Sequence, residues 1–198
     1  MNKAVASALA LFALASTSAF AAPSPARQHV EGDLQTGCKT LGVVKLCGDQ
    51  EQALVVAGKP TDLMFALGNE TRSFEIEKRG NFYRVKLGIP GVADTDFFHF
   101  EEVSFERVGP RYLVTKFTYA SSHECDGRPD LRRLDTLDFK GQTLTTELEP
   151  AWTASGKPWK YIDKKSLPTL DIYKLSSSVV TDLMAETPAN EKLCEIYG

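Results

Sequence analysis

The residues best suited to chemistry in this chain are acidic and histidine side chains in two short stretches. In the first, 94–102, the candidates Asp94, Asp96, His99 and Glu101 follow one another at intervals of two, three and two residues. Side chains two residues apart point to the same face of a β-strand, so His99 and Glu101 are expected to be neighbours on one face. The pattern suits a carboxylate–imidazole site for Ca²⁺, or an acid–base pair in which Glu101 orients His99. The rest of a calcium loop is missing, so a turn that leads into a half-exposed strand is the favoured interpretation and no metal site is assigned.

The second stretch, 121–130, combines His123, Asp126, Arg128 and Asp130 with turn-forming glycine and proline. Such a run is most often a solvated connection between strands. Loops held by a rigid scaffold are also where binding residues concentrate, so this stretch is the favoured binding region.

Trp152 and Trp159 are the only 2 tryptophans, and both fall in a Pro- and Gly-containing segment, 149–165, that is expected to be a long loop. Exposed tryptophans can stack on a sugar ring or anchor a protein partner. The alternative is that both cover an open end of the β-sheet core. We include both among the candidate binding residues.

No catalytic signature accompanies these candidates. The chain has no G-x-S-x-G elbow, no phosphate-binding G-x-x-x-x-G-K and no H-E-x-x-H, and it contains only 3 histidines. The sequence therefore favours a non-catalytic protein without a cofactor.

The first 21 residues have the features of a secretory signal peptide. Lys3 provides a positive charge, an Ala/Leu-rich run follows, and Ala19-Phe20-Ala21 offers a cleavage site. No later stretch is apolar enough to span a bilayer. The Ala-rich signal is typical of bacteria, which predicts a periplasmic or secreted protein with a flexible segment at 22–37 and a single domain at 38–198.

The four cysteines Cys38, Cys47, Cys125 and Cys194 all lie beyond the signal. An even number of cysteines in an exported chain predicts disulfides. Three pairings are possible, and we expect Cys38–Cys47 and Cys125–Cys194, because the first pair flanks a short segment that can fold back on itself.

Short runs of β-type residues recur along the chain, separated by turn residues, and several pairs of runs have the pattern of hairpins. The clearest pairs are 72–78 with 82–87, 97–108 with 112–119, and 134–139 with 143–148; the run 41–47 is expected to be one strand. A helix is expected after three serines at 176–178, with Val179, Val180, Leu183 and Met184 at helical spacing. The predicted fold is mainly β: an antiparallel meander of about eight strands that forms a curved sheet, barrel or sandwich, with a short C-terminal helical segment.

The formal net charge of −3 argues against nucleic acid and anionic lipid surfaces as partners. The sequence is most consistent with an exported binding protein, of the inhibitor or immunity type, that binds a hydrolase or toxin in the bacterial envelope. An acidic surface would suit capture of a basic protein partner. The alternatives are a carrier of a lipid or other small hydrophobic ligand, and an envelope hydrolase that uses carboxylates.

Overall fold

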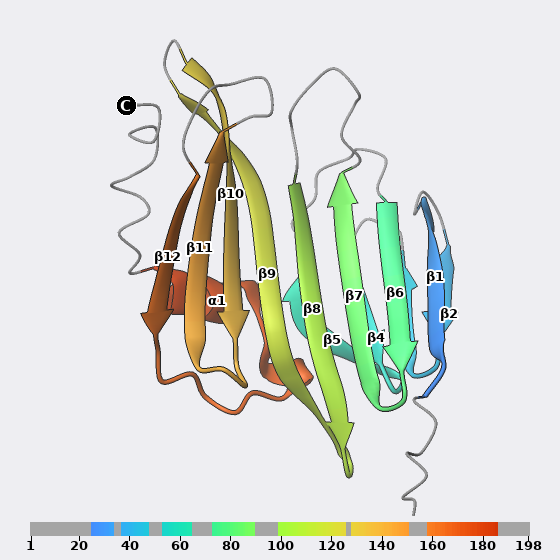
Figure 1. Ribbon diagram of the computed structural model, residues 1–198. Coiled ribbons are helices and arrows are strands. Elements are labelled where there is room, and N and C mark those ends of the chain that lie inside the picture. Colours follow the sequence, from blue (N-terminus) through green and yellow to red (C-terminus); the bar gives the residue numbers. More distant parts are fainter. Residues whose placement is uncertain are drawn as a thin grey trace, which may run out of the picture.

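The computed structural model describes residues 25–33, 37–47, 53–64, 73–89, 99–125, 128–150 and 158–185. These residues form two packed layers (Figure 1). One layer is an eight-stranded antiparallel sheet, and the other is a four-stranded antiparallel sheet with helix α1 (Ser177–Met184) beside it. Neither sheet closes into a barrel, so the mainly β, antiparallel fold that the sequence predicts is confirmed in its two-layered form.

The large sheet is a meander apart from its first strand, which lies at one edge. In spatial order its strands are β1 (Arg27–Asp33), β6 (Ser73–Arg79), β7 (Phe82–Ile89), β8 (His99–Val108), β9 (Arg111–Cys125), β10 (Arg128–Asp138), β11 (Thr143–Pro150) and β12 (Trp159–Lys164). The small sheet contains β2 (Cys38–Leu41), β3 (Val44–Cys47), β4 (Ala53–Val56) and β5 (Lys59–Met64).

Tight turns with glycine at the first central position form two hairpins of the meander. Gly80 and Asn81 connect β6 to β7, and Gly80 has φ of 61°. Gly109 and Pro110 connect β8 to β9 in the same way, with φ of 60° at Gly109. A positive φ at the first central residue matches the right-handed twist of the flanking strands. The hairpins predicted at these positions are confirmed.

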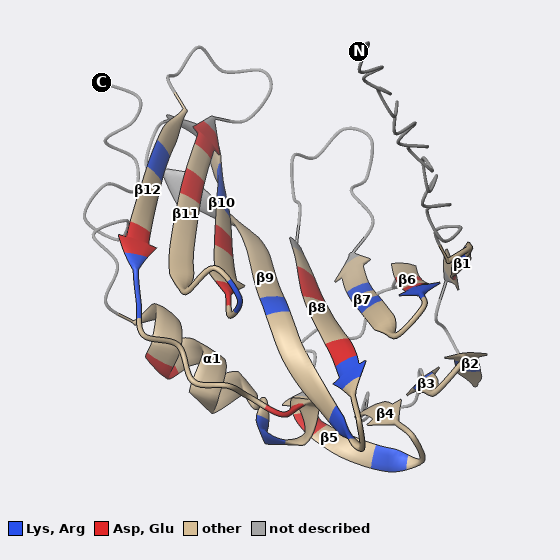
Figure 2. Ribbon diagram, turned by 60° about the horizontal axis from the view of Figure 1, so that its bottom comes forward, with Lys and Arg blue, Asp and Glu red and all other residues tan. Residues whose placement is uncertain are grey.

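Alternation along the strands decides which side chains form the core. In β6, Phe74 and Ile76 are buried, whereas Glu75 and Glu77 lie on the other face. The buried face of the large sheet packs on Val44, Leu46, Leu54 and Val56 of the small sheet in one hydrophobic cluster, which also includes Val180 of α1. The opposite face of the large sheet carries Glu75, Glu77, Arg84 and Glu102, and acidic and basic residues recur along the strands (Figure 2).

The segment that follows β12 ties the two layers together. Leu113 in β9 forms an isolated bridge with Asp171, and the Val114 N–H donates to the Leu170 carbonyl at 2.8 Å. The Tyr173 hydroxyl donates to the Val56 carbonyl of the small sheet at 2.7 Å. A short 3₁₀ helix, η1 (Ile172–Lys174), precedes α1.

Helix α1 begins where the sequence predicts. The Ser176 side chain accepts a hydrogen bond from the Val179 N–H, which satisfies one of the free donors at the helix start. With eight residues, α1 is far shorter than the roughly 20 residues that cross a bilayer, and no described helix could span a membrane.

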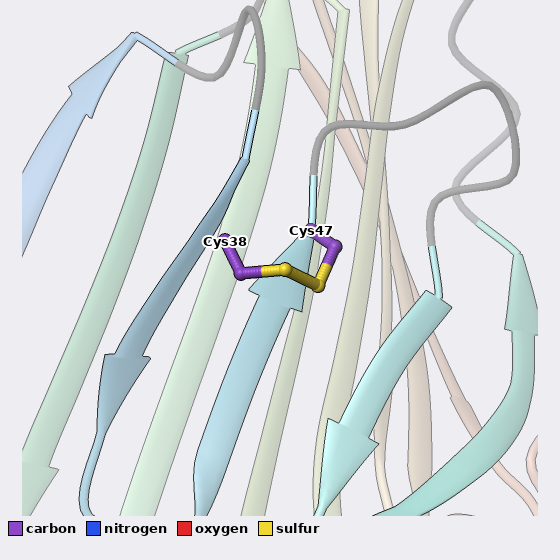
Figure 3. The surroundings of a disulfide bond; sticks show 2 residues. All are labelled: Cys38 and Cys47. Atoms are coloured by element: carbon purple, nitrogen blue, oxygen red, sulfur yellow. A yellow bond between two sulfur atoms is a disulfide. The ribbon is translucent and has the colours of Figure 1, made fainter.

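The predicted Cys38–Cys47 disulfide is present (Figure 3), with an S–S distance of 2.04 Å. The two cysteines lie directly opposite each other in β2 and β3. The expectation of a single strand at 41–47 is wrong, because Gly42 and Val43 turn the chain between these two strands. Cys194, and with it the predicted Cys125–Cys194 bridge, lies outside the described residues, as does the predicted signal peptide at 1–21.

Two further segments differ from the expectations. Residues 159–164, expected to belong to a long loop, form the edge strand β12, because Thr143 to Leu148 of β11 provide a pairing partner. Residues 27–33, which lie within the segment expected to be flexible, form β1 and pair along their whole length with β6. In both cases the hydrogen bonds come from another strand, β6 for β1 and β11 for β12.

Candidate functional site

A cavity of about 420 Å³ lies where the second layer changes from strand to helix. In this layer β5 contacts α1, and residues of β8, β9 and β10 in the large sheet line the cavity from the other side. A flat sheet and a cylindrical helix fit differently against the same surface, which leaves space at their junction. The cavity is lined by Leu63, Glu101, Phe117, Tyr119, Arg133, Ser177, Val180, Thr181, Met184 and Ala185.

One side of the cavity is apolar. Leu63 of β5, Phe117 of β9 and Val180 of α1 are 1%, 2% and 4% exposed. Met184 at the end of α1 is half-buried and packs against the same core. An apolar portion of a ligand would gain free energy by leaving water and contacting this wall.

The other side is polar because the strand register brings polar side chains into one row. Glu101, Tyr119, Asp135 and Thr146 are direct partners across β8, β9, β10 and β11. Neighbouring strands lie about 4.8 Å apart, so each member of this row adjoins the next. With Arg133, two residues before Asp135, they form what we call the inner cluster.

Asp135 is held by both of its neighbours. The Arg133 Nε donates to Asp135 Oδ2 at 2.6 Å, and the Thr146 hydroxyl donates to Asp135 Oδ1 at 2.6 Å. The side chains of Arg133 and Asp135 are 12% and 3% exposed, and Thr146 is fully buried. Charge-assisted bonds of this kind fix the orientation of a guanidinium group. Arg133 is therefore presented to the cavity in a defined position.

Tyr119 and Glu101 interact at the centre of the row. Burial raises the pKa of the Tyr119 hydroxyl, and the negative charge of Glu101 raises this pKa further, while a hydrogen bond with Ser121 acts in the opposite direction. Tyr119 therefore keeps its proton at neutral pH and can donate or accept a hydrogen bond. Glu101 itself is only 7% exposed and also lines the cavity.

The structure thus places one residue of the first predicted stretch, Glu101, at the cavity. His99 occupies the first position of β8, opposite Ile89, but its side chain lies outside the description. Asp94 and Asp96 are also outside the described residues. Within the described part of the chain, no group of three His, Cys, Asp or Glu side chains could hold a metal ion.

Sequence reasoning missed the two charged residues of β10 in the inner cluster. Arg133 and Asp135 lie between Leu131 and Leu137 on one face of β10, and both leucines are fully buried. Two charged residues at the inward positions of an otherwise apolar strand face are the signal that would have identified them.

The second predicted stretch, 121–130, extends a hairpin rather than forming a broad loop. His123 pairs with Leu131, and Cys125 pairs with Arg128, so strand pairing continues up to the turn. Asp126 lies outside the described residues, as do the side chains of His123, Arg128 and Asp130. Recognition of a hydrolase or toxin by this stretch therefore stays a prediction from the sequence.

Trp159 lies in β12, where its ring stacks on Tyr161 with centroids 5.9 Å apart. Trp159 is half-buried and pairs with Leu148, which in turn pairs with Arg133, so it lies two strands from the cavity wall. Trp152 is outside the described residues. The tryptophans are therefore not shown to share one site.

A second charged cluster occupies the uncovered face of the large sheet. Arg84 lies 3.2 Å from Glu75, 3.1 Å from Glu77 and 3.7 Å from Glu102, and these four residues form the outer cluster. Burial raises the pKa of Glu102, although the positive charge of Arg84 opposes this shift. The cluster borders an open groove of about 480 Å³ that also involves Lys116 and other polar residues.

Comparison of the chain with protein-family models, with curated protein sequences and with solved structures found no match. The function is therefore argued from the geometry of the site.

Proposed function

We propose that this chain is an exported, non-catalytic binding protein that holds a small amphipathic ligand between the large sheet and α1. The observation that carries the proposal is the cavity with one apolar and one polar wall. Its volume of about 420 Å³ falls in the lower part of the usual range for small-molecule sites, about 300 to 1,000 Å³. Few convergent polar groups in a mainly apolar cavity are typical of such sites.

The volume limits the size of the ligand. At about 30 Å³ for each water-sized unit, the space accepts a molecule of roughly ten to fifteen non-hydrogen atoms. A single alkyl chain of about ten carbons with a polar head fits this limit, whereas a lipid with two long chains does not. The alkyl chain would contact Leu63, Phe117 and Val180, and the head group would lie at Glu101, Tyr119 and Arg133.

The state of Asp135 supports binding over carboxylate-dependent hydrolysis. Catalysis by a carboxylate pair needs two groups that reach the substrate. Asp135 is buried, and both of its oxygens accept hydrogen bonds from Arg133 and Thr146. Asp135 is therefore better placed to hold the cavity wall in position than to take part in a reaction.

Export to the periplasm or the medium is supported by two independent features. The Cys38–Cys47 disulfide is of a kind that persists in oxidising compartments. The N-terminal 21 residues have the composition of a secretory signal.

The binding proposal is tested with 1-naphthylamine, an uncharged dye that is small enough for this volume and whose emission shifts to shorter wavelength in apolar surroundings. We expect saturable binding of the dye to the purified chain and its displacement by decan-1-ol. Thr181→Trp would fill the cavity from α1 and weaken dye binding at least tenfold. Asp182→Trp is the matched control, because Asp182 is the next helix residue, is exposed and does not line the cavity. Equal dye binding by the two variants would show that the dye binds elsewhere and would refute the proposed site.

A further inference from the structure

We propose that the open groove of about 480 Å³ beside the outer cluster is a second binding site, and that its ligand is a neutral saccharide. The groove and the cavity lie on opposite faces of the large sheet, so this site does not depend on the binding function proposed above. Three features carry the proposal: a bulge that adds a side chain to the groove, two buried hydroxyl groups that line it, and an aromatic ring beside them.

A β-bulge between β8 and β9 shapes the groove. Lys116 pairs with Ser104, and Val114 pairs with Phe105. Thr115 is therefore an extra residue in β9. Neighbouring side chains of a regular strand point to opposite faces, but a bulge changes their direction locally. Thr115 and Lys116 consequently both line the groove, together with Ser104.

The hydroxyl groups of Ser104 and Thr115 are available to a ligand. The two residues are 4% and 8% exposed, and neither side chain forms a hydrogen bond with another described residue. Thr118, in the same strand and 7% exposed, differs because its hydroxyl lies 3.4 Å from that of Thr136. A buried hydroxyl is costly without a partner, and it can both donate and accept. A ligand rich in hydroxyl groups would satisfy both residues.

The ion pairs of the groove disfavour a charged ligand. Arg84 lies 3.1 Å from Glu77 and 3.7 Å from Glu102. Lys140 lies 2.6 Å from Glu106. A ligand with a charge of its own would compete with these pairs, whereas a neutral ligand can accept from the basic groups and donate to the carboxylates without separating them.

Lys116 and Asp138 fit the same conclusion. Burial raises the pKa of Glu102, and Lys116 is among the positive charges that oppose this shift, so Lys116 lies close to a carboxyl group. Asp138 accepts hydrogen bonds from the N–H groups of Lys140 and Gly141 at 3.0 and 2.7 Å. Acidic and basic groups thus alternate along the groove, and neither sign is left to select an ion.

Phe82 gives the groove an apolar part. Its half-buried ring lines the groove beside the polar groups. The C–H face of a sugar ring can pack on an aromatic ring while the hydroxyl groups of the sugar bind polar side chains. At about 30 Å³ for each water-sized unit, the groove accommodates roughly fifteen non-hydrogen atoms, which is one sugar ring and part of a second.

The test is a titration of the ¹⁵N-labelled protein followed by NMR. Three neutral disaccharides are used: cellobiose, maltose and N,N′-diacetylchitobiose. We expect at least one of them to cause saturable shifts of the amide signals of Ser104, Thr115 and Lys116, while the signals of Tyr119 and Val180 at the cavity stay in place. Digalacturonate, a negatively charged disaccharide, and chitobiose, positively charged at pH 6, should bind at least threefold more weakly than the best neutral one.

Thr115→Val should weaken disaccharide binding at least fivefold, because it removes one hydroxyl and keeps the shape of the side chain. Thr118→Val is the matched control, because Thr118 is equally buried in the same strand but does not line the groove. Its dissociation constant should stay within about twofold of the wild type. Phe82→Leu should also weaken binding, whereas Phe100→Leu, an aromatic residue of β8 outside the groove lining, should not.

The wild-type titration decides the location even if a variant does not fold, and the amide spectrum of each variant shows whether it is folded. The absence of shifts with all three neutral disaccharides would overturn the proposal. Saturable shifts confined to other parts of the chain would place the saccharide elsewhere and refute this groove. Tighter binding of either charged disaccharide would refute the neutral ligand, and equal effects of Thr115→Val and Thr118→Val would refute the role of the bulge.

Discussion

The large sheet carries an arginine–carboxylate cluster on each of its two faces. In the inner cluster, Arg133 contacts one aspartate, Asp135, at 2.6 Å between the two layers. In the outer cluster, Arg84 is shared by three glutamates at 3.1 to 3.7 Å on the face that no other layer covers. The same residue types, in the same sheet, thus meet two very different environments.

The difference concerns how completely the polar groups are satisfied. The carboxylate of Asp135 accepts hydrogen bonds on both oxygens, one of them from the fully buried Thr146. Arg84 keeps a side chain 29% exposed, although its Nε atom is itself buried and has no hydrogen-bond partner among the described residues. A buried pair must satisfy its bonds because water cannot do so, whereas water reaches the exposed groups of a surface cluster. The stability of the protein is therefore expected to depend on each member of the inner cluster. Loss of a member of the outer cluster is expected to change stability little.

The largest effect is expected for Asp135→Ala. The substitution leaves Arg133 as a charge without its carboxylate between the two layers, and removal of one partner from a buried pair costs about 3 to 5 kcal/mol. Urea unfolding followed by circular dichroism measures the loss in the free energy of unfolding. The double variant Arg133→Met/Asp135→Leu should recover most of the loss, because apolar side chains need no partner there. A cost below about 1 kcal/mol for Asp135→Ala would mean that the inner cluster behaves like a surface pair.

A smaller loss is expected for Thr146→Val. The substitution keeps the shape of the side chain but removes the 2.6 Å hydrogen bond to Asp135, and hydrogen bonds to charged groups contribute about 1.5 to 3 kcal/mol. Thr145→Val in the same strand is the control, because Thr145 is half-buried on the other face and should change stability by less than about 0.5 kcal/mol. Equal effects of the two substitutions would show that strand propensity, not the bond to Asp135, determines the result.

Arg84→Met should lower the free energy of unfolding by only about 1 kcal/mol or less. Partly exposed ion pairs contribute little to stability, although three glutamates without their arginine repel one another. The cost should also decrease when NaCl is raised from 0.05 M to 1 M, since salt screens exposed charges. The cost of Asp135→Ala should change little over the same range. An Arg84→Met effect that is large and independent of salt would contradict the proposed contrast between the two faces.

The smallest effect concerns the pH dependence of Glu102. Its pKa is raised in the folded protein, mainly by burial, so the folded state binds a proton more readily than the unfolded state. The contribution of Glu102 to stability therefore rises as the pH falls through the folded pKa, and it is complete below the unfolded value. Glu102→Gln should flatten the stability curve in this acidic range and stabilise the protein slightly at pH 7. Glu106→Gln is the control, because Glu106 lies in the same strand with a side chain 38% exposed, against 17% for Glu102, and its loss should leave the slope in this range closer to that of the wild type.

Much of the fold follows from local sequence. The Gly-containing turns at Gly80 and Gly109 and the period-two alternation on either side of them predict the hairpins, because both signals act within a few residues. The cap at Ser176 and the helical spacing of the apolar residues after it predict α1 for the same reason. The strands β1 and β12 were not predicted, because the composition of each resembles that of a loop. Each is an edge strand whose hydrogen bonds come from a single neighbouring strand, and no local pattern reveals that pairing.

The candidate site was predictable only in part. The sequence singles out Glu101 as a candidate metal ligand or as the acid–base partner of His99. Its position beside Tyr119 depends on the register between β8 and β9, and the approach of Arg133 depends on the next strand along. No spacing within one segment reveals these neighbours, because each of them comes from a different strand.

By itself, the sequence determined the strand-rich character of the chain, the positions of its main hairpins and helix, and the pairing of Cys38 with Cys47. These features depend on backbone preferences and on residues that are close together along the chain. The tertiary structure alone decided that β5 and α1 share one layer, that a cavity remains at their junction, and that the Arg133–Asp135 pair lies beside it. The physical reason is that layer packing and strand register join residues far apart in the sequence, and no local pattern encodes which of them will meet.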